Sequence, residues 1–233
     1  MMKGPIVIVG CGHSGTSVLL AALGSHSEIF AVPQESSFGF MNEREAKKSL
    51  LDFSTQAAAS EKRRWAEKTP KHIHKLERIF SLVPDAKVVI MLRDGRDVAC
   101  SIRDRTGSLI GGIQRWVTDN TAGLPYWDDP RVHVVRYEDL VAHFEATMRN
   151  VMVFLKEEYE QEIRMFHKDE KKWYSNKLSR PPSSFGEYHN QYRNWQINQP
   201  LFDGRGRWKK LTADEYDSIE TIGKDLLTKL GYI

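Results

Sequence analysis

A glycine-bracketed loop near the start of the chain combines residue types that can hold an anion. Residues 5–24 read PIVIVGCGHSGTSVLLAALG, an apolar run with Gly10 and Gly15 followed by a helical pattern. Free N–H groups and the positive dipole end at a helix start favour a phosphate-like group. A kinase P-loop needs a lysine directly after the second glycine, whereas Thr16 and Ser17 follow here. The segment predicts a phosphate-binding loop not built for ATP, with an ordinary strand-to-helix turn as the alternative.

A second candidate anion contact lies in residues 87–101, which read KVVIMLRDGRDVACS. The apolar run predicts a buried strand that delivers Arg93 at its carboxyl end, and a helix then presents Ser101. Arginine offers a planar fork suited to phosphate oxygens, and a serine hydroxyl adds a donor. The alternative is that Arg93 pairs with Asp94 or Asp97 and only caps the turn.

These segments need a scaffold that brings the ends of several strands together. Uninterrupted β-branched runs predict strands buried on both faces, each followed by a polar turn and a helical pattern. This order predicts an α/β fold with a parallel sheet covered by helices, in which ligands bind at the carboxyl ends of the strands. The expected strands are residues 6–9, 87–92 and 132–135, with weaker ones at 29–32 and 65–68.

Helical periodicity is expected over much of the intervening chain. The expected helices are residues 15–23, 43–59, 72–82, 97–105, 109–120, 143–155 and 213–230. Before the last of these, Thr212 is the expected N-cap, and Glu215 completes a capping box. The charged segment 168–185 is expected to be solvated surface, with a lid over the strand ends as the alternative.

Composition limits the class of protein. The chain has 233 residues, of which 40% are hydrophobic, enough for one large or two small folded domains. A net charge of +3 is too small for a general nucleic-acid binder. The first apolar run is too short for a signal peptide and no stretch approaches a membrane span, so a cytoplasmic location is expected. Cys11 and Cys100 lack metal-ligand or disulfide spacing and are expected to be free thiols.

Taken together, the motifs resemble one enzyme family. GCGHSGTS, EKTP, PDAKVVIMLRDGRDVACS, VRYEDLV and GRGRWKKLT follow one another within residues 5–140 and 204–232. This order is similar to that of the sulfotransferases that use 3′-phosphoadenosine 5′-phosphosulfate (PAPS). The resemblance implies one three-layer, P-loop-like α/β domain over residues 1–233. It also implies sulfuryl transfer to a hydroxyl or amine of a small-molecule or carbohydrate-like acceptor, with 3′-phosphoadenosine 5′-phosphate (PAP) as product and no metal, nucleic acid or membrane involved.

The resemblance also implies a set of site residues. The loop would bind the 5′-phosphosulfate, and Arg93 with Ser101 would bind the 3′-phosphate. Lys68 would reach the phosphosulfate, and Glu35 resembles the catalytic base of the carbohydrate and tyrosine branches of the family. A basic segment near the C-terminus would help to enclose the nucleotide. The loop residues are Gly12, His13, Ser14, Gly15, Thr16 and Ser17, and the C-terminal residues are Arg205, Arg207 and Trp208.

Two departures from the family pattern affect these expectations. The family usually has arginine or lysine where this chain has His13, and commonly has proline where it has Gly95. A histidine donates a hydrogen bond better when protonated, which is partial near neutral pH. His13 is therefore expected to be a weaker electrophilic group in catalysis, with a solvent-exposed turn residue as the alternative. Gly95 is expected to change mainly the stiffness of its turn.

Several alternatives stay open from the sequence. Glu35 can be a surface carboxylate, and Lys68 can pair with Glu35 or Glu67. Tyr137, in VRYEDLV, is expected to belong mainly to a structural polar network, and His189 is expected to be an ordinary histidine.

Two rival functions also stay open. One is a nucleotide-binding protein without catalysis, and the other is a phosphoryl transferase. The retained Lys68 argues against the first, and the missing P-loop lysine argues against the second. Acceptor selectivity is expected in the less family-like residues 36–64, 106–130 and 168–198.

Overall fold

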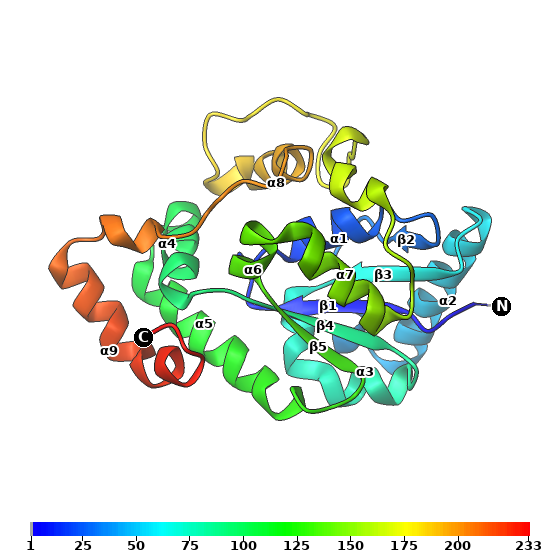
Figure 1. Cartoon of the computed structure of the whole chain (residues 1–233), viewed down its shortest axis with the longest axis horizontal. Helices are drawn as coiled ribbons and strands as arrows, with labels where there is room; N and C mark the ends of the chain where they lie inside the picture. Colours follow the sequence, from blue (N-terminus) through cyan, green and yellow to red (C-terminus); the bar gives the residue numbers. More distant parts are fainter. Residues whose placement is uncertain (1) are drawn as a thin grey trace.

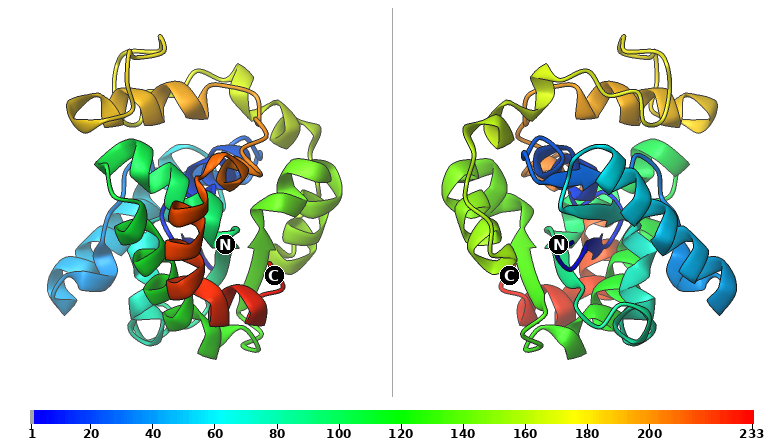
Figure 2. Two further views of the ribbon diagram at one scale, coloured as in Figure 1. Left: turned by 90° about the vertical axis from the view of Figure 1, so that its left-hand side faces the viewer. Right: turned by 90° about the vertical axis from the view of Figure 1, so that its right-hand side faces the viewer.

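The computed structural model describes residues 2–233 and contains a parallel sheet with helices on both faces (Figure 1, Figure 2). The strand order is β2-β3-β1-β4-β5, and every neighbouring pair is parallel. The predicted α/β class is therefore confirmed, and both weaker strands belong to the sheet. The strands are β1 Ile6–Gly10, β2 Ile29–Ala31, β3 Arg64–Lys68, β4 Lys87–Leu92 and β5 Val132–Arg136.

Helices occupy most of the predicted ranges. They are α1 Thr16–Leu23, α2 Glu43–Ala59, α3 Leu76–Leu82, α4 Gly95–Thr106, α5 Leu109–Gly123, α6 Tyr137–Ala142, α7 Phe144–Leu155, α8 His189–Ile197 and α9 Ala213–Lys229. The expected helix at 72–82 is shorter, because a 3-10 turn at Pro70–Lys75 precedes α3. The sequence did not predict α6 and α8, which are only 6 and 9 residues long and show little periodicity.

Both faces of the sheet are buried, which explains why the strands read as continuous apolar runs. On β1, Ile6 and Ile8 pack into the core formed with α1 and α7, while Val7 and Val9 pack into the core on the α2 and α3 side. A third core joins α4, α5 and α9 around Trp116. These helices fix the position of every strand end.

The last helix is capped as predicted. The Thr212 hydroxyl accepts a hydrogen bond from the Glu215 N–H at 3.3 Å, and the Glu215 carboxylate accepts one from the Thr212 N–H at 3.0 Å. This capping box starts α9, which packs against α5 and holds the C-terminal segment close to the sheet.

The carboxyl ends of the strands meet at one edge of the sheet. In the register, Ile8 pairs with Lys68, Gly10 with Met91 and Leu92 with Arg136. The strands therefore deliver the loop after β1, the end of β3 and the turn after β4 to one place. The segment that contains α8 lies at the top of the molecule, above α1, in Figure 1 and in both views of Figure 2.

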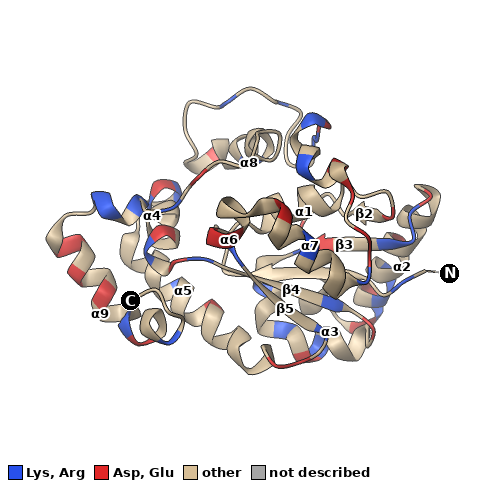
Figure 3. Ribbon diagram, viewed as in Figure 1, with Lys and Arg blue, Asp and Glu red and all other residues tan. Residues whose placement is uncertain are grey.

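Basic and acidic residues are interspersed over the outer elements in the view of Figure 3. A local cluster of basic side chains, rather than the electrostatic field of the whole protein, must therefore attract any anionic ligand. Within residues 2–233, no helix combines the length and the apolar character needed to cross a bilayer.

Candidate active site

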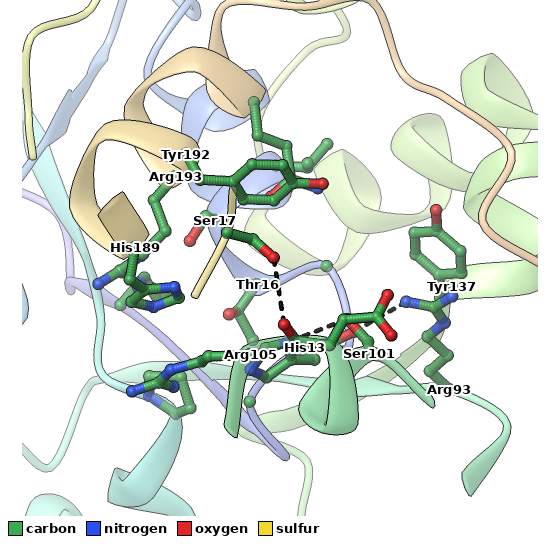
Figure 4. Close-up of a pocket in the computed structure, with 18 of the residues that line it drawn as sticks. His13, Thr16, Ser17, Arg93, Ser101, Arg105, Tyr137, His189, Tyr192 and Arg193 are labelled. Atoms are coloured by element: carbon green, nitrogen blue, oxygen red, sulfur yellow. Dashed lines mark hydrogen bonds between the residues drawn. The ribbon is translucent and has the colours of Figure 1, made fainter. Parts of the chain in front are cut away.

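A cavity of about 490 Å³ lies at the carboxyl edge of the sheet, below α8 (Figure 4). Basic side chains outnumber acidic ones among the residues that line it, which favours an anionic ligand. The basic residues are Lys68, Lys71, Arg93, Arg105, Arg115, Arg193 and Arg207, and the acidic residues are Glu35 and Asp104.

Most of the predicted site residues come together in this cavity. Those that line it are Gly12, His13, Gly15, Thr16, Ser17, Glu35, Lys68, Arg93, Ser101 and Arg207. Three predicted residues are not among the lining residues. Ser14 is buried beneath the loop, Arg205 forms an ion pair with Asp203, and Trp208 packs against the Arg96 guanidinium at 4.0 Å.

The loop after β1 has the geometry of an anion site. Gly15 has a φ of 92° and ends the loop directly before α1, and a Cβ there would lie 2.9 Å from the Tyr137 ring. Glycine is therefore required by both backbone conformation and space. In the described chain, no side chain caps α1 and no acidic residue occupies its first turn. The start of α1 thus offers N–H donors and a positive dipole end to the cavity.

Arg93 enters the cavity from the end of β4 with only 4% of its surface exposed. Its Nη1 donates to the His13 carbonyl at 2.9 Å, its Nη2 donates to the Gly204 carbonyl, and its guanidinium lies 4.3 Å from the centre of the Tyr137 ring. The alternative of an ion pair with Asp94 or Asp97 is wrong. Among the described residues no carboxylate pairs with Arg93, so a buried positive charge faces the cavity.

His13 is half-buried rather than a solvent-exposed turn residue. Its Nδ1 lies 2.9 Å from the Ser101 hydroxyl, and its φ of 71° is unusual for a non-glycine residue. Burial, followed by the charges of Arg105 and Arg115, lowers the pKa of His13 to about 3. The expected partial protonation near neutral pH is therefore wrong, because nearby cations and burial keep the ring neutral.

Glu35 is held between two cations. Its Oε1 accepts hydrogen bonds from Lys68 Nζ and from Arg193 Nη2, each at 2.7 Å. Burial by itself would raise the pKa of Glu35, but Lys68 and Arg193 outweigh it and the pKa is lowered. Glu35 is therefore a carboxylate at neutral pH, and it lines the cavity although 37% of its side chain is exposed.

A buried network holds Glu35 in place. Glu67, on β3 beside Lys68, is fully buried and accepts hydrogen bonds from the Ser36 N–H at 3.0 Å, the Ser36 hydroxyl at 2.9 Å and the Thr69 hydroxyl. The other Glu67 oxygen lies 3.2 Å from His72 Nδ1, while His72 Nε2 accepts from the Gly39 N–H. The segment that follows Glu35 is thereby fixed to the strand that carries Lys68.

The structure adds lining residues that the sequence did not single out. Arg105 is four residues after Ser101 on α4, so both lie on one helix face, and this spacing was a usable signal. Arg115 comes from α5, and Tyr192 and Arg193 come from α8, for which the sequence offered no such signal.

Two residues expected to be structural or ordinary also line the cavity. The Tyr137 hydroxyl donates to the Phe202 carbonyl at 3.0 Å, and its ring packs under Arg93. The His189 ring centre lies 6.4 Å from that of His13, and Figure 4 shows it facing the cavity from α8. Burial, with help from Arg105, lowers the pKa of His189 to about 4.

Gly95 has a steric role that differs from the expected change in turn stiffness. A Cβ at this position would lie 2.5 Å from the Trp116 ring. Trp116 in turn donates from Nε1 to the Arg93 carbonyl at 2.8 Å. The glycine therefore admits the ring that supports the backbone of Arg93.

Comparisons with known proteins show what the chain and its fold are similar to. Nodulation protein NoeE of Sinorhizobium fredii (strain NBRC 101917 / NGR234) is 25% identical over 285 residues, and the match covers 97% of this chain. This chain spans 65% of the length of that relative. The fold is shared with mouse sulfotransferase SULT7A1 complexed with PAP, at a TM-score of 0.67, 14% identity and coverage of 97% of this chain and 84% of the other.

A second solved structure with this fold is the sulfotransferase domain from the curacin biosynthetic pathway. Its TM-score is 0.61 at 19% identity, with coverage of 97% of this chain and 98% of the other. The model of the sulfotransferase family matches residues 40–161, which is more than half of the chain. The match includes Lys68, Arg93 and Ser101, and the chain belongs to the sulfotransferase family.

Proposed function

We propose that this protein transfers a sulfuryl group from PAPS to a hydroxyl or amine of a small-molecule or carbohydrate-like acceptor. The observation that carries the proposal is one cavity that brings two candidate anion contacts together. The first is the uncapped start of α1, and the second lies at Arg93 and Ser101. PAPS carries anionic groups at two separate ribose positions, so the two positions fit its 5′-phosphosulfate and its 3′-phosphate.

The unpaired charges of the second position also fit a phosphate. Arg105 is half-buried, and in the described part of the chain no carboxylate pairs with it. Burial and the charges of Arg115 and Arg193 lower the pKa of Arg105. A bound anion would stabilise the charged form of Arg105 in this environment. The mouse sulfotransferase with this fold is complexed with PAP, which supports the same class of donor here.

The proposed reaction is an in-line displacement at sulfur. The acceptor oxygen or nitrogen forms a bond to sulfur, while the bond between sulfur and the bridging oxygen of the 5′-phosphate breaks. The acceptor proton passes to the Glu35 carboxylate, and the electron pair of the broken bond leaves with PAP. Lys68 stabilises the charge that develops on the bridging oxygen. Neutral His13 contributes at most a hydrogen bond.

Replacement of the proposed base is the direct test. Glu35→Gln is expected to lower turnover by about 10²- to 10⁴-fold, because the amide cannot accept the acceptor proton. The dissociation constant for PAP, measured by calorimetry, is expected to stay close to that of the wild type. Glu43→Gln is the matched control, since Glu43 also pairs with a lysine but lies on the exposed start of α2. Unchanged turnover in Glu35→Gln would remove Glu35 from the mechanism.

The donor class has its own test. Calorimetric titration of the wild type with PAP and with ATP is expected to give tighter binding of PAP, because only PAP carries a 3′-phosphate for Arg93 and Ser101. Tight binding of PAP without transfer to a broad acceptor panel would favour a nucleotide-binding protein. Preference for ATP would overturn the proposal in favour of phosphoryl transfer.

A further inference from the structure

We infer that Arg115, on α5, is a catalytic residue that contacts the transferring sulfuryl group and supplies the cation that the loop after β1 lacks. This inference rests on the proposed function. Charge develops on the sulfuryl and bridging oxygens during transfer, and a fixed cation beside them lowers the barrier. The loop itself offers backbone N–H groups, hydroxyls and the neutral ring of His13.

The Arg115 guanidinium lies directly against the loop. A Cβ built on Gly12 would be 2.8 Å from Arg115 Nη2 and 3.2 Å from its Cζ. A side chain at position 12 would crowd the guanidinium and shift this flexible end of Arg115, whereas glycine leaves room for its present position. Gly12 is adjacent to His13, so the cation from α5 reaches the point where the loop has none of its own.

Arg115 is held through one nitrogen only, which leaves its fork free. Its Nε donates to Asp119 Oδ2 at 3.2 Å, one helical turn later on α5. Asp119 is buried, and its other oxygen lies 2.7 Å from His74 Nε2. Within the described residues, neither Nη1 nor Nη2 of Arg115 has a hydrogen-bond acceptor. The guanidinium is thus held by Asp119 at Nε, and Arg115 is among the residues that line the cavity.

Most other cations of the cavity already have an ion-pair or hydrogen-bond partner, or lie beside Ser101 at the second anion position. Lys68 and Arg193 bind Glu35, and Arg207 pairs with Asp104. Arg93 donates to two carbonyl groups, and Arg105 belongs to the helix face of Ser101. Lys71 also lines the cavity, but it is exposed and its ammonium is not a planar fork. Arg115 is therefore the cation that combines contact with the loop and a free fork. Its closeness to His13 is also visible in the lowered pKa of that ring.

The test compares two nucleotides that differ by the sulfuryl group. Calorimetry with PAP and PAPS on Arg115→Ala is expected to show affinity for PAPS falling at least about tenfold more than affinity for PAP, as for loss of a charge-assisted contact. Slow release of PAP from PAPS in water, which needs no acceptor, is expected to fall by about the same factor or more. Arg149→Ala is the matched control, because Arg149 also pairs with a carboxylate four residues away but lies on α7 outside the cavity.

A second variant asks whether the missing charge itself is the cause. His13→Arg in the Arg115→Ala background is expected to restore much of the affinity for PAPS and of the hydrolysis rate, because it puts a cation back beside Gly12. If Arg115→Ala proves unstable, Arg115→Gln keeps the stem and a hydrogen bond to Asp119 but removes the charge, and the same losses are expected.

Failure of this inference and failure of the proposed function give different results. Equal losses for PAP and PAPS would place Arg115 on a nucleotide phosphate and overturn the inference, as would unchanged values for both. A wild type that binds neither nucleotide would instead overturn the proposed function.

Discussion

Two of the regions that line the cavity are built differently. The floor comprises residues 10–17, 67–69 and 92–101, which follow directly from the ends of β1, β3 and β4. Its functional side chains are anchored in the core, as shown by Lys68 with 2% and Arg93 with 4% of their surface exposed. The roof comprises residues 169–200, with α8 and an irregular segment before it (Figure 1). The floor is therefore fixed by the sheet, whereas the roof is an addition to it.

Polar contacts of the roof are largely internal. The Asn194 side chain binds the Tyr174 N–H and the Lys177 carbonyl, and the Asn198 side chain binds both backbone groups of Lys171. One ion pair, between Arg193 and Glu35, links the roof to the other side of the cavity. The charged residues of the segment 168–185 are mostly exposed, as predicted, but the segment also contributes Ser184 to the cavity. Ile197 anchors the roof in the apolar core beside α1, while exposed roof residues can vary without disturbing the floor, which suits a role in acceptor selectivity.

The largest effect on nucleotide binding is expected from the floor. Arg93→Ala is expected to weaken PAP binding by about 1.5–3 kcal/mol, roughly 10- to 100-fold, because a buried positive charge and its unpartnered Nε donor are lost. Calorimetry against Arg63→Ala, an exposed arginine paired with Glu28, provides the measurement and its control. An unaltered dissociation constant would show that the 3′-phosphate does not bind at the floor.

The second prediction concerns the support beneath the floor. Glu67→Gln is expected to lower the free energy of unfolding by about 1–3 kcal/mol, because one of its hydrogen-bonding oxygens becomes an amide in a buried site. Turnover is also expected to fall, with PAP affinity retained, since the segment that carries Glu35 loses its attachment to β3. Urea unfolding and steady-state kinetics measure the two effects.

A close control for this prediction exists elsewhere in the chain. Glu160 also accepts hydrogen bonds from the N–H and hydroxyl of a serine, Ser27, but lies away from the cavity. Glu160→Gln is expected to leave turnover unchanged. Equal turnover in Glu67→Gln and Glu160→Gln would mean that the buried network does not position Glu35.

A smaller effect is expected from the roof. Arg193→Ala removes one of the two cations that lower the pKa of Glu35, so that pKa is expected to rise. The acid limb of the pH–rate profile is therefore expected to move to higher pH, while PAP affinity changes by no more than about twofold. A large loss of PAP affinity would contradict the division between floor and roof.

The smallest effect compares a histidine from each region. The folded-state pKa is about 3 for His13 and about 4 for His189, both below the value of about 6.5 expected in the unfolded chain. As pH falls below about 6.5, the unfolded chain takes up protons that the folded protein does not, so the free energy of unfolding decreases. His13→Asn and His189→Asn are each expected to make this decrease less steep. Urea unfolding between pH 7.5 and 4.5 measures the slopes, and unchanged slopes would show that neither pKa is lowered.

The sequence predicted the floor well because its signals are local. Strand β4 has the predicted bounds of residues 87–92, since a strand buried on both faces reads as an unbroken apolar run. The end of β4 carries Arg93 into the cavity, and the end of β3, predicted as a weaker strand, carries Lys68 there. Arg105 could also have been predicted from the sequence, because it follows Ser101 by four residues on one helix.

The roof and the charge state of His13 were beyond the sequence because they depend on distant contacts. Helix α8 reads HNQYRNWQI, with little helical periodicity, and its link to Glu35 joins residues 158 positions apart. The pKa of His13 depends on burial and on arginines from α4 and α5. The residues next to His13 and Glu35 in the sequence contain no information on such long-range contacts.

The ion pairs of Glu35 with Lys68 and with Arg193 have a consequence for the order in which the substrates bind. One carboxylate oxygen binds both Lys68 from the floor and Arg193 from the roof. Under the proposed function, an arriving phosphosulfate competes with Glu35 for Lys68, which frees the carboxylate from one of its two positive neighbours. Glu35 then becomes more basic only after the donor has bound. The ion pair between Glu35 and Lys68 would thus keep the base weak until the donor binds. It would thereby favour binding of the donor before the acceptor.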